Sequence, residues 1–203
     1  MERIALLSFH GCPYAKIGDR DTGGMNIYVL KLAEELGRLG LIVDVFTRIH
    51  DITDPLIVDI SENARVIHLQ AGPPDESKTK LHNHILKFTN ALNHFSETNK
   101  LKYDLIYSHY WLSGVVAEKI KQEFNIPFVF TAHSLGLFTQ EQNIPQDRVS
   151  QERQIMLDSD AVTASSNFEL DFINEHYDIP KSKIVKITPG VNKNIFSPNE
   201  GYR

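Results

Sequence analysis

The sequence predicts an α/β protein built on a Rossmann-like parallel sheet with helices on both faces. Short apolar runs rich in β-branched residues recur along the chain, and they are continuous rather than alternating, as in strands buried on both faces. Segments with helical spacing separate most of these runs, which is the pattern of right-handed βαβ crossovers. With 203 residues, 41% of them hydrophobic, the chain is long enough to bury a full core.

Seven apolar runs are the expected strands. They are, in chain order, residues 4–7, 42–46, 64–69, 105–107, 128–130, 161–163 and 184–187. The stretch 48–62 mixes Asp, Pro, Thr and Ile without one period, so it is either a loop or a short hairpin. Residues 71–79 contain Gly72-Pro73-Pro74 and are expected to form a loop.

Four segments carry helical signals. The clearest runs from Ile27 to Leu39 and ends at Gly40, a residue type common just after a helix. The others are residues 111–124, 147–158 and 166–177, the last with Ser166 as its N-cap. We expect residues 1–188 to form the Rossmann-like domain. Residues 189–203 carry turn residues with no strand or helix after them, and we expect them to begin a connector to a further domain.

The composition excludes several functions. The formal net charge is −5 and the charges are scattered, so neither a nucleic-acid footprint nor a membrane-surface patch is expected. The single cysteine, Cys12, cannot close an intrachain disulfide, and no base is apparent for it, so no chemistry is assigned to it. No apolar run approaches the length of a membrane span, and no signal peptide is apparent, which predicts a cytoplasmic protein.

Ligands of open parallel sheets bind outside the carboxyl ends of the strands. The loop after the first expected strand leads into Gly23 and Gly24 at a helix start, where backbone N–H groups and the helix dipole favour an anion. The pair is therefore either a phosphate or diphosphate seat or simply a tight strand-to-helix turn. The sequence lacks both G-x-G-x-x-G and the P-loop motif.

Two histidines follow neighbouring strands. His109 and His133 end the fourth and fifth expected strands, which makes a joint role more plausible than for a lone histidine. Tyr110 and Trp111 follow His109; they either bind a polyol or cap the core.

Lys78 and Arg148 lie in the loops and helix starts of the same region and indicate a negatively charged small substrate, although each taken alone is an ordinary surface charge. His82 and His84, two residues apart, point to different faces of a helix and are not interpreted as metal ligands, so no metal is expected.

Five segments stand in a recognisable order along the chain: Ser8-Phe9-His10 with Pro13, Asp21-Thr22-Gly23-Gly24-Met25-Asn26, Ser108-His109-Tyr110-Trp111, Thr131-Ala132-His133-Ser134 and Pro189-Gly190-Val191. They resemble the N-terminal half of the family 4 retaining glycosyltransferases. Within that family they are most similar to the group of sucrose-phosphate synthases, sucrose synthases and D-inositol 3-phosphate glycosyltransferases. The resemblance spans nearly the whole chain.

The resemblance implies one half of a GT-B fold, with an acceptor-binding domain here and a donor-binding domain beyond this chain. It implies that Gly23 and Gly24 bind the donor diphosphate and that His133 lines the reaction centre as the catalytic residue. The acceptor residues that it implies are His10, Asp21, Asn26, Lys78, Tyr110, Ser134 and Arg148. Lys80 is the alternative to Lys78, and Ser134 stands where the inositol-phosphate enzymes have Thr.

The resulting hypothesis is a retaining glycosyltransferase that moves a sugar from a nucleotide sugar, by resemblance a UDP-sugar, to a phosphorylated sugar or polyol such as fructose 6-phosphate or inositol 3-phosphate. It needs no cofactor or metal, and this half is expected to be inactive alone. Two alternatives remain open. One is a binding module that recognises a sugar phosphate without catalysis. The other is a nicotinamide-dependent oxidoreductase with Asp44 as the ribose-binding acid.

Overall fold

The computed structural model describes residues 2–15, 22–139, 147–192 and 196. Within these residues the strands are β1 (Arg3–Leu7), β2 (Ile42–Arg48), β3 (Ile57–Ser61), β4 (Ala64–Leu69), β5 (Leu105–His109), β6 (Phe128–Thr131), β7 (Ala161–Ala164) and β8 (Ile184–Lys186). The α-helices are α1 (Gly24–Arg38), α2 (Ile85–Thr98), α3 (Trp111–Phe124), α4 (Arg148–Asp158) and α5 (Asn167–Tyr177). Two 3-10 helices are η1 (Lys78–His84) and η2 (Lys181–Lys183).

All these strands form one sheet in the order β3-β4-β2-β1-β5-β6-β7-β8. The sheet is parallel, as predicted, except at one edge, where β3 runs antiparallel to β4. The seven strands that the sequence predicts are all parallel to their neighbours among themselves. The stretch 48–62, open between a loop and a short hairpin, contributes only β3, which forms a hairpin with the predicted strand β4. The physical reason is the connection: only Glu62 and Asn63 separate β3 from β4, which is too short for a crossover.

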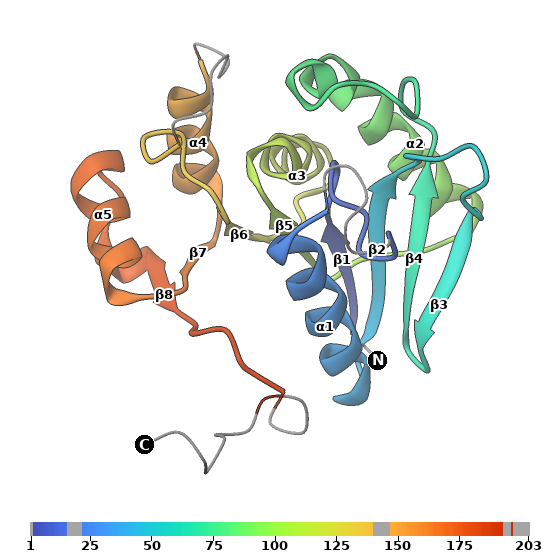
Figure 1. The fold of residues 1–203 in the computed structure, drawn as a ribbon, viewed down its shortest axis with the longest axis horizontal. Coiled ribbons are helices and arrows are strands. Elements are labelled where there is room, and N and C mark those ends of the chain that lie inside the picture. Colours follow the sequence, from blue (N-terminus) through green and yellow to red (C-terminus); the bar gives the residue numbers. More distant parts are fainter. Residues whose placement is uncertain (1, 16–21, 140–146, 193–195, 197–203) are drawn as a thin grey trace.

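The strand order reverses between β1 and β5. From β1 the chain adds β2 and β4 on one side, and then β5 to β8 on the other side. Figure 1 shows the result, with β3 at one end of the sheet and β8 with α5 at the other. In open α/β sheets the ligand-binding crevice lies at such a reversal, outside the carboxyl ends of the strands.

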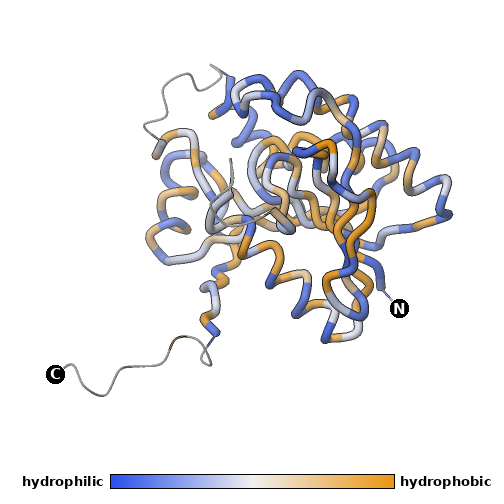
Figure 2. Tube along the Cα trace, turned by 45° about the vertical axis from the view of Figure 1, so that its right-hand side comes forward, coloured by the Kyte–Doolittle hydropathy of each residue, from blue (hydrophilic) through white to orange (hydrophobic). Residues whose placement is uncertain are grey.

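The core has two parts, one on each face of the sheet. Alternate residues of β1 divide between them: Ile4 and Leu6 pack with α1, whereas Ala5 and Leu7 belong to the larger cluster that contains buried residues of α2 to α5. Figure 2 shows the hydrophobic segments concentrated in the interior of the trace. Helices thus cover both faces, as predicted, but unequally.

Most helices begin and end as the sequence predicts. Helix α3 has the predicted bounds, and the hydroxyl of Ser166 accepts a hydrogen bond from the backbone N–H of Glu169, as an N-cap does. The sequence reasoning missed α2, although Ile85, Phe88 and Leu92 are buried at helical spacing on it.

The predicted connector is partly described. Residues 189–192 form neither helix nor strand. Among the described residues, no helix combines the length and the apolar character that crossing a membrane requires.

Candidate functional site

The candidate site lies at the carboxyl edge of the sheet, next to the reversal of strand order. β1, β5 and β6 end there at Leu7, His109 and Thr131. A cavity of about 1440 Å³ opens at this edge on the α1 side of the sheet. Its lining includes Gly24, Tyr28, Thr131, His133, Ser134 and Thr163. These six residues present hydroxyl, imidazole or bare backbone groups to one space, which suits a polar ligand.

His109 and His133 form a pair, as their positions at neighbouring strand ends predicted. Nδ1 of His109 lies 2.9 Å from Nε2 of His133, so one nitrogen donates and the other accepts. Burial lowers the pKa of His133 to about 4 and holds the pKa of His109 well below its usual value. Both rings are therefore neutral near pH 7. Because Nε2 of His133 is occupied by His109, Nδ1 is the nitrogen that His133 has for a ligand.

Tyr110 is the centre of a cationic cluster. Its ring lies 4.3 Å from the ring of His10, centroid to centroid. The Nζ of Lys78 lies 5.1 Å from the Tyr110 centroid, and the guanidinium carbon of Arg148 lies 5.0 Å from it. The structure thus brings together four predicted acceptor residues from four segments of the chain. Lys80, the alternative to Lys78, is exposed at the start of η1.

The pKa of His10 is lowered by burial and by the positive charges of this cluster. Burial, followed by the charge of Lys78, lowers the pKa of His10 to about 3, with smaller contributions from His133, Arg148 and Arg48. Its Nδ1 is buried and has no hydrogen-bond partner among the described residues. A buried polar atom of this kind costs free energy unless something binds it, so it is a candidate contact for a ligand.

Arg148 is itself fully buried and fixed by its neighbours. Its Nε donates to Oε1 of Glu152 at 2.8 Å, and its Nη2 donates to the backbone carbonyl of Ser134 at 3.0 Å. Oε2 of Glu152 accepts from the backbone N–H of Gly136 at 2.8 Å and from the hydroxyl of Tyr177 at 2.6 Å. The ion pair therefore fixes the loop that follows β6, which carries Ser134.

Sequence reasoning missed Arg48, the last residue of β2. This buried side chain donates to the carbonyl oxygens of Pro73 at 2.5 Å and Pro74 at 3.2 Å, and so it holds the loop that precedes Lys78. A charged residue that ends an apolar run was the available signal.

Gly23 and Gly24 stand at the start of α1, with Gly23 as the N-cap. A Cβ added to either would meet nothing within 4 Å among the described residues, so their packing does not require glycine there. Asn26 is buried and links this start to the preceding loop: its Oδ1 accepts from the N–H of Gly23 at 3.2 Å, and its Nδ2 donates to the carbonyl of Cys12 at 2.8 Å. Asp21, the other predicted acceptor residue, lies outside the described residues.

Two site residues have unusual backbone conformations. Tyr110 has φ 72° and ψ 155°, and His133 has φ 56°. Non-glycine residues adopt a positive φ at a cost of the order of 1 to 3 kcal/mol, and such residues concentrate at functional sites. The strain lies on two of the residues that the sequence singled out.

The burial of Trp111 and of Asp44 decides between the alternatives that the sequence left open for each. Trp111 is buried in the core, as the capping alternative proposed. Asp44 lies inside β2, where it accepts from Arg3 at 2.6 Å, Arg65 at 2.6 Å and the hydroxyl of Tyr103 at 2.8 Å. Its carboxylate is thus held by side chains of the protein, away from the strand end where a ribose-binding acid would stand.

The two histidines of η1 belong to no cluster of possible metal ligands among the described residues, but two other histidines do. Among the described residues, ligand atoms of Cys12, His50 and His68 lie within 4.8 Å of one another, whereas His82 and His84 belong to no such group. The sequence reasoning gave Cys12 no chemical role and expected no metal.

Comparisons with known proteins agree with this fold. The model of Glycosyltransferase Family 4 matches residues 22–194, and the chain belongs to that family. It is 34% identical to the D-inositol 3-phosphate glycosyltransferase of Corynebacterium glutamicum and 38% identical to that of Corynebacterium urealyticum, over 97% of this chain in both cases. These alignments cover 49% and 48% of the two relatives, so the chain spans about half the length of the curated relatives it matches.

A solved structure shows the same architecture. The sucrose-phosphate synthase of Thermosynechococcus elongatus superposes with a TM-score of 0.90 at 34% identity, over 98% of this chain and 51% of that chain. The fold is therefore the Rossmann-like half of a GT-B protein, as the sequence predicted.

Proposed function

We propose that this chain is the acceptor-side domain of a retaining glycosyltransferase that moves a sugar from a nucleotide sugar to a phosphorylated sugar or polyol. The observation that carries the proposal is the cluster in which Lys78 and Arg148 flank the ring of Tyr110 beside the open Nδ1 of His10. Membership of glycosyltransferase family 4 supports the reaction class. The named relatives act on D-inositol 3-phosphate or form a sucrose phosphate, and both names contain a phosphorylated sugar or polyol.

The cluster suits a phosphate for electrostatic reasons. Two cationic side chains face one aromatic ring, and the neighbouring imidazole is neutral, so a dianion placed among them gains charge-assisted hydrogen bonds. Arg148 is fixed by Glu152 and Ser134, so little side-chain entropy is lost when it binds. Ser134 offers its hydroxyl next to Arg148, and one N–H of Asn26 remains for an acceptor hydroxyl. Asp21 is assigned to the acceptor hydroxyls by resemblance alone.

The donor side of the proposal rests on the start of α1. The N–H groups of its first turn and the helix dipole favour the negative charge that builds on a diphosphate as it leaves. At Gly23 and Gly24 no described residue lies within 4 Å of the position that a Cβ would take. We assign His133 to the reaction centre, where it would hydrogen-bond the donor sugar through Nδ1.

The reaction exchanges one C–O bond for another. The acceptor hydroxyl oxygen bonds to the anomeric carbon on the face from which the diphosphate departs, the bond to the diphosphate oxygen breaks, and that oxygen takes the hydroxyl proton. The protein contributes position and charge neutralisation rather than a nucleophile. A UDP-sugar is the proposed donor, fructose 6-phosphate and inositol 3-phosphate are the proposed acceptors, and a second, donor-binding domain completes the site. No metal or cofactor takes part in this proposal.

The test is a kinetic comparison of Lys78→Ala with Lys80→Ala in the full-length protein. UDP-glucose and UDP-N-acetylglucosamine are offered with fructose 6-phosphate and inositol 3-phosphate. Loss of one charge-assisted contact of about 2 kcal/mol raises the acceptor KM about 30-fold in Lys78→Ala and leaves the donor KM nearly unchanged. The control variant Lys80→Ala, at an exposed position, should have the same donor and acceptor KM as the unaltered protein.

Two results would count against the proposal. If Lys78→Ala changes the donor and acceptor KM equally, Lys78 does not hold the acceptor phosphate. If no sugar is transferred from any of these donors while the chain still binds the phosphorylated compounds, the alternative of a binding module holds instead.

A further inference from the structure

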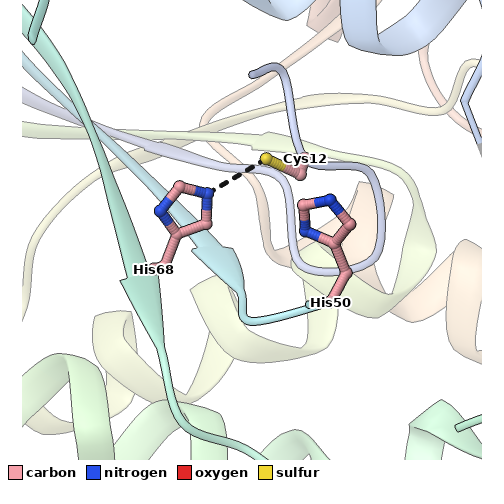
Figure 3. Close-up of side chains that lie close together, drawn as sticks. All are labelled: Cys12, His50 and His68. Atoms are coloured by element: carbon pink, nitrogen blue, oxygen red, sulfur yellow. Dashed lines mark hydrogen bonds between the residues drawn. The ribbon is translucent and has the colours of Figure 1, made fainter. Parts of the chain in front are cut away.

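A second cluster lies at the same sheet edge, beside β2 and β4 and outside the site described above. It joins the thiol of Cys12 from the loop after β1, the imidazole of His50 from the segment after β2, and the imidazole of His68 from β4. Figure 3 shows the three side chains converging, with His68 turned toward the sulfur. The Sγ of Cys12 lies 3.1 Å from Nε2 of His68, and one ligand atom from each residue lies within 4.8 Å of the other two.

We propose that Cys12, His50 and His68 form a Zn²⁺ site that fixes the loop after β1 to the ends of β2 and β4. The inference does not depend on the proposed function. One thiolate and two imidazoles are ligands that zinc prefers, and three protein ligands leave the fourth tetrahedral position to water.

The distances suit zinc after a small adjustment. With Zn–S near 2.3 Å and Zn–N near 2.0 Å, tetrahedral ligand atoms lie about 3.5 Å apart. The Cys12 to His68 distance of 3.1 Å is already close to this value. His50, whose side chain is 32% exposed and which follows the end of a strand, can move the remaining distance.

The hydrogen bonds around the cluster already hold His68 in the form that a metal needs. Nδ1 of His68 lies 2.7 Å from the carbonyl oxygen of Pro55, which can only accept, so Nδ1 carries the proton. With the proton on Nδ1, the ring presents the lone pair of Nε2 to the sulfur of Cys12, 3.1 Å away. Second-shell carbonyls hold metal-bound histidines in this way.

His50 lies beside an acidic side chain. Its Nδ1 is 2.8 Å from Oδ2 of Asp54, and the same oxygen accepts from the backbone N–H of Asp51 at 2.9 Å. Carboxylates beside metal-bound histidines are common second-shell groups, although Nδ1 of His50 makes no hydrogen bond among the described residues.

Binding of zinc would release one proton. Without a metal the thiol carries its proton, which it donates toward Nε2 of His68, 3.1 Å from the sulfur. Zinc forms a bond to the sulfur, the S–H bond breaks, and the proton passes to solvent. Since the carbonyl of Cys12 accepts from Asn26, the metal would also stiffen the start of α1, where Gly23 and Gly24 lie.

The experiment is metal titration of the metal-free chain under a phosphine reductant. Zinc binding is followed by competition with a chromogenic chelator, and Co²⁺ serves as the spectroscopic probe. We expect one Zn²⁺ per chain, a thiolate-to-cobalt charge-transfer band with tetrahedral d–d bands, and a higher Tm when zinc is present.

Three variants separate the site from adventitious binding. Cys12→Ser should abolish the charge-transfer band, and His50→Gln should weaken zinc binding about 100-fold without disturbing the core, since His50 is only half-buried. His82→Gln, an exposed histidine outside the cluster, is the matched control and should bind as the unaltered chain does. If Cys12→Ser does not fold, the zinc affinity of His50→Gln compared with that of His82→Gln still tests the site.

The proposal fails if the unaltered chain binds less than one equivalent of zinc, if cobalt gives no thiolate band, or if His50→Gln binds zinc as tightly as His82→Gln. In any of these cases the contact between Cys12 and His68 is a plain hydrogen bond.

Discussion

Two buried carboxylates at opposite ends of the sheet differ in how far their cationic partners are exposed to water. Asp44, near the amino ends of the strands, is completely buried, but its partners Arg3 and Arg65 keep 21% and 30% of their side chains exposed. Glu152, beside the carboxyl ends, is also completely buried, and its partner Arg148 is only 1% exposed. One cluster therefore keeps contact with water through its cations, and the other does not.

The difference shows what a buried ion pair contributes beside a site. The Asp44 cluster joins strands and reaches no ligand position. The Arg148–Glu152 pair instead holds the backbone of Ser134 and Gly136, in the loop that also carries His133. A buried ion pair adds little net stability, because both charges lose their hydration when the chain folds. It does hold the surrounding backbone in one geometry, and a loop of candidate ligand residues requires a fixed geometry.

The largest effect is expected when each carboxylate is removed in turn. Glu152→Ala leaves the guanidinium of Arg148 buried without its partner and should cost about 4 kcal/mol of unfolding free energy. Asp44→Ala should cost about 2 kcal/mol, because Arg3 and Arg65 can be hydrated. Urea denaturation of both variants measures the difference. Equal losses, or the reverse order, would show that exposure of the cations does not separate the two clusters.

A second effect is expected from pH, through the buried histidines at the carboxyl end. His10 and His133 have a pKa of about 3 and about 4 in the folded chain, against about 6.5 when unfolded. Between pH 6.5 and the folded values the unfolded chain binds more protons, so stability falls as the pH falls. Each histidine should lower the free energy of unfolding by about 2 kcal/mol between pH 7 and pH 5.

Denaturation of His10→Gln and of the exposed control His94→Gln at pH 7 and pH 5 isolates this contribution. His10→Gln should lose about 2 kcal/mol less than the unaltered chain over this interval. If His94→Gln reduces the loss as much, the buried histidines are not its source.

The smallest effect on stability is expected at Gly24. A Cβ there meets nothing within 4 Å, and alanine favours helices over glycine, so Gly24→Ala should change stability by at most about 1 kcal/mol, toward greater stability. Under the proposed function the same methyl group occupies the approach of the diphosphate and raises the donor KM about tenfold.

Gly114→Ala is the matched control. Its Cβ would lie 2.7 Å from a side-chain carbon of the buried Ile155, so this change should cost about 1 to 3 kcal/mol. A donor KM unchanged in Gly24→Ala would remove Gly24 from the donor site.

The fold was largely predictable because strands buried on both faces leave a clear pattern. The run at residues 64–69 has the observed bounds of β4, and α3 begins and ends as predicted. The direction of β3 could not be read from its residues, because it depends on the two-residue turn at Glu62 and Asn63, and that turn follows only once both strand ends are known.

Part of the site was predictable for the same reason. Parallel strands end at one edge, so His109 and His133 at neighbouring strand ends had to lie close together. The resemblance assigned Lys78 and Tyr110 to one acceptor site, but only the structure places Lys78 over the Tyr110 ring. Arg48, which holds the loop before Lys78, was missed. Such contacts join loops whose paths depend on packing rather than on local periodicity.

By itself, then, the sequence determined the alternation of strands and helices, the edge at which we expect ligands to bind and the family, because apolar periodicity and short motifs are local properties of the chain. Only the tertiary structure decided which side chains meet at that edge. Cys12, His50 and His68 are far apart along the chain and lie together only because the order β4-β2-β1 places the ends of their strands side by side. That order is set by burial of both faces of the sheet at once, which no single segment encodes.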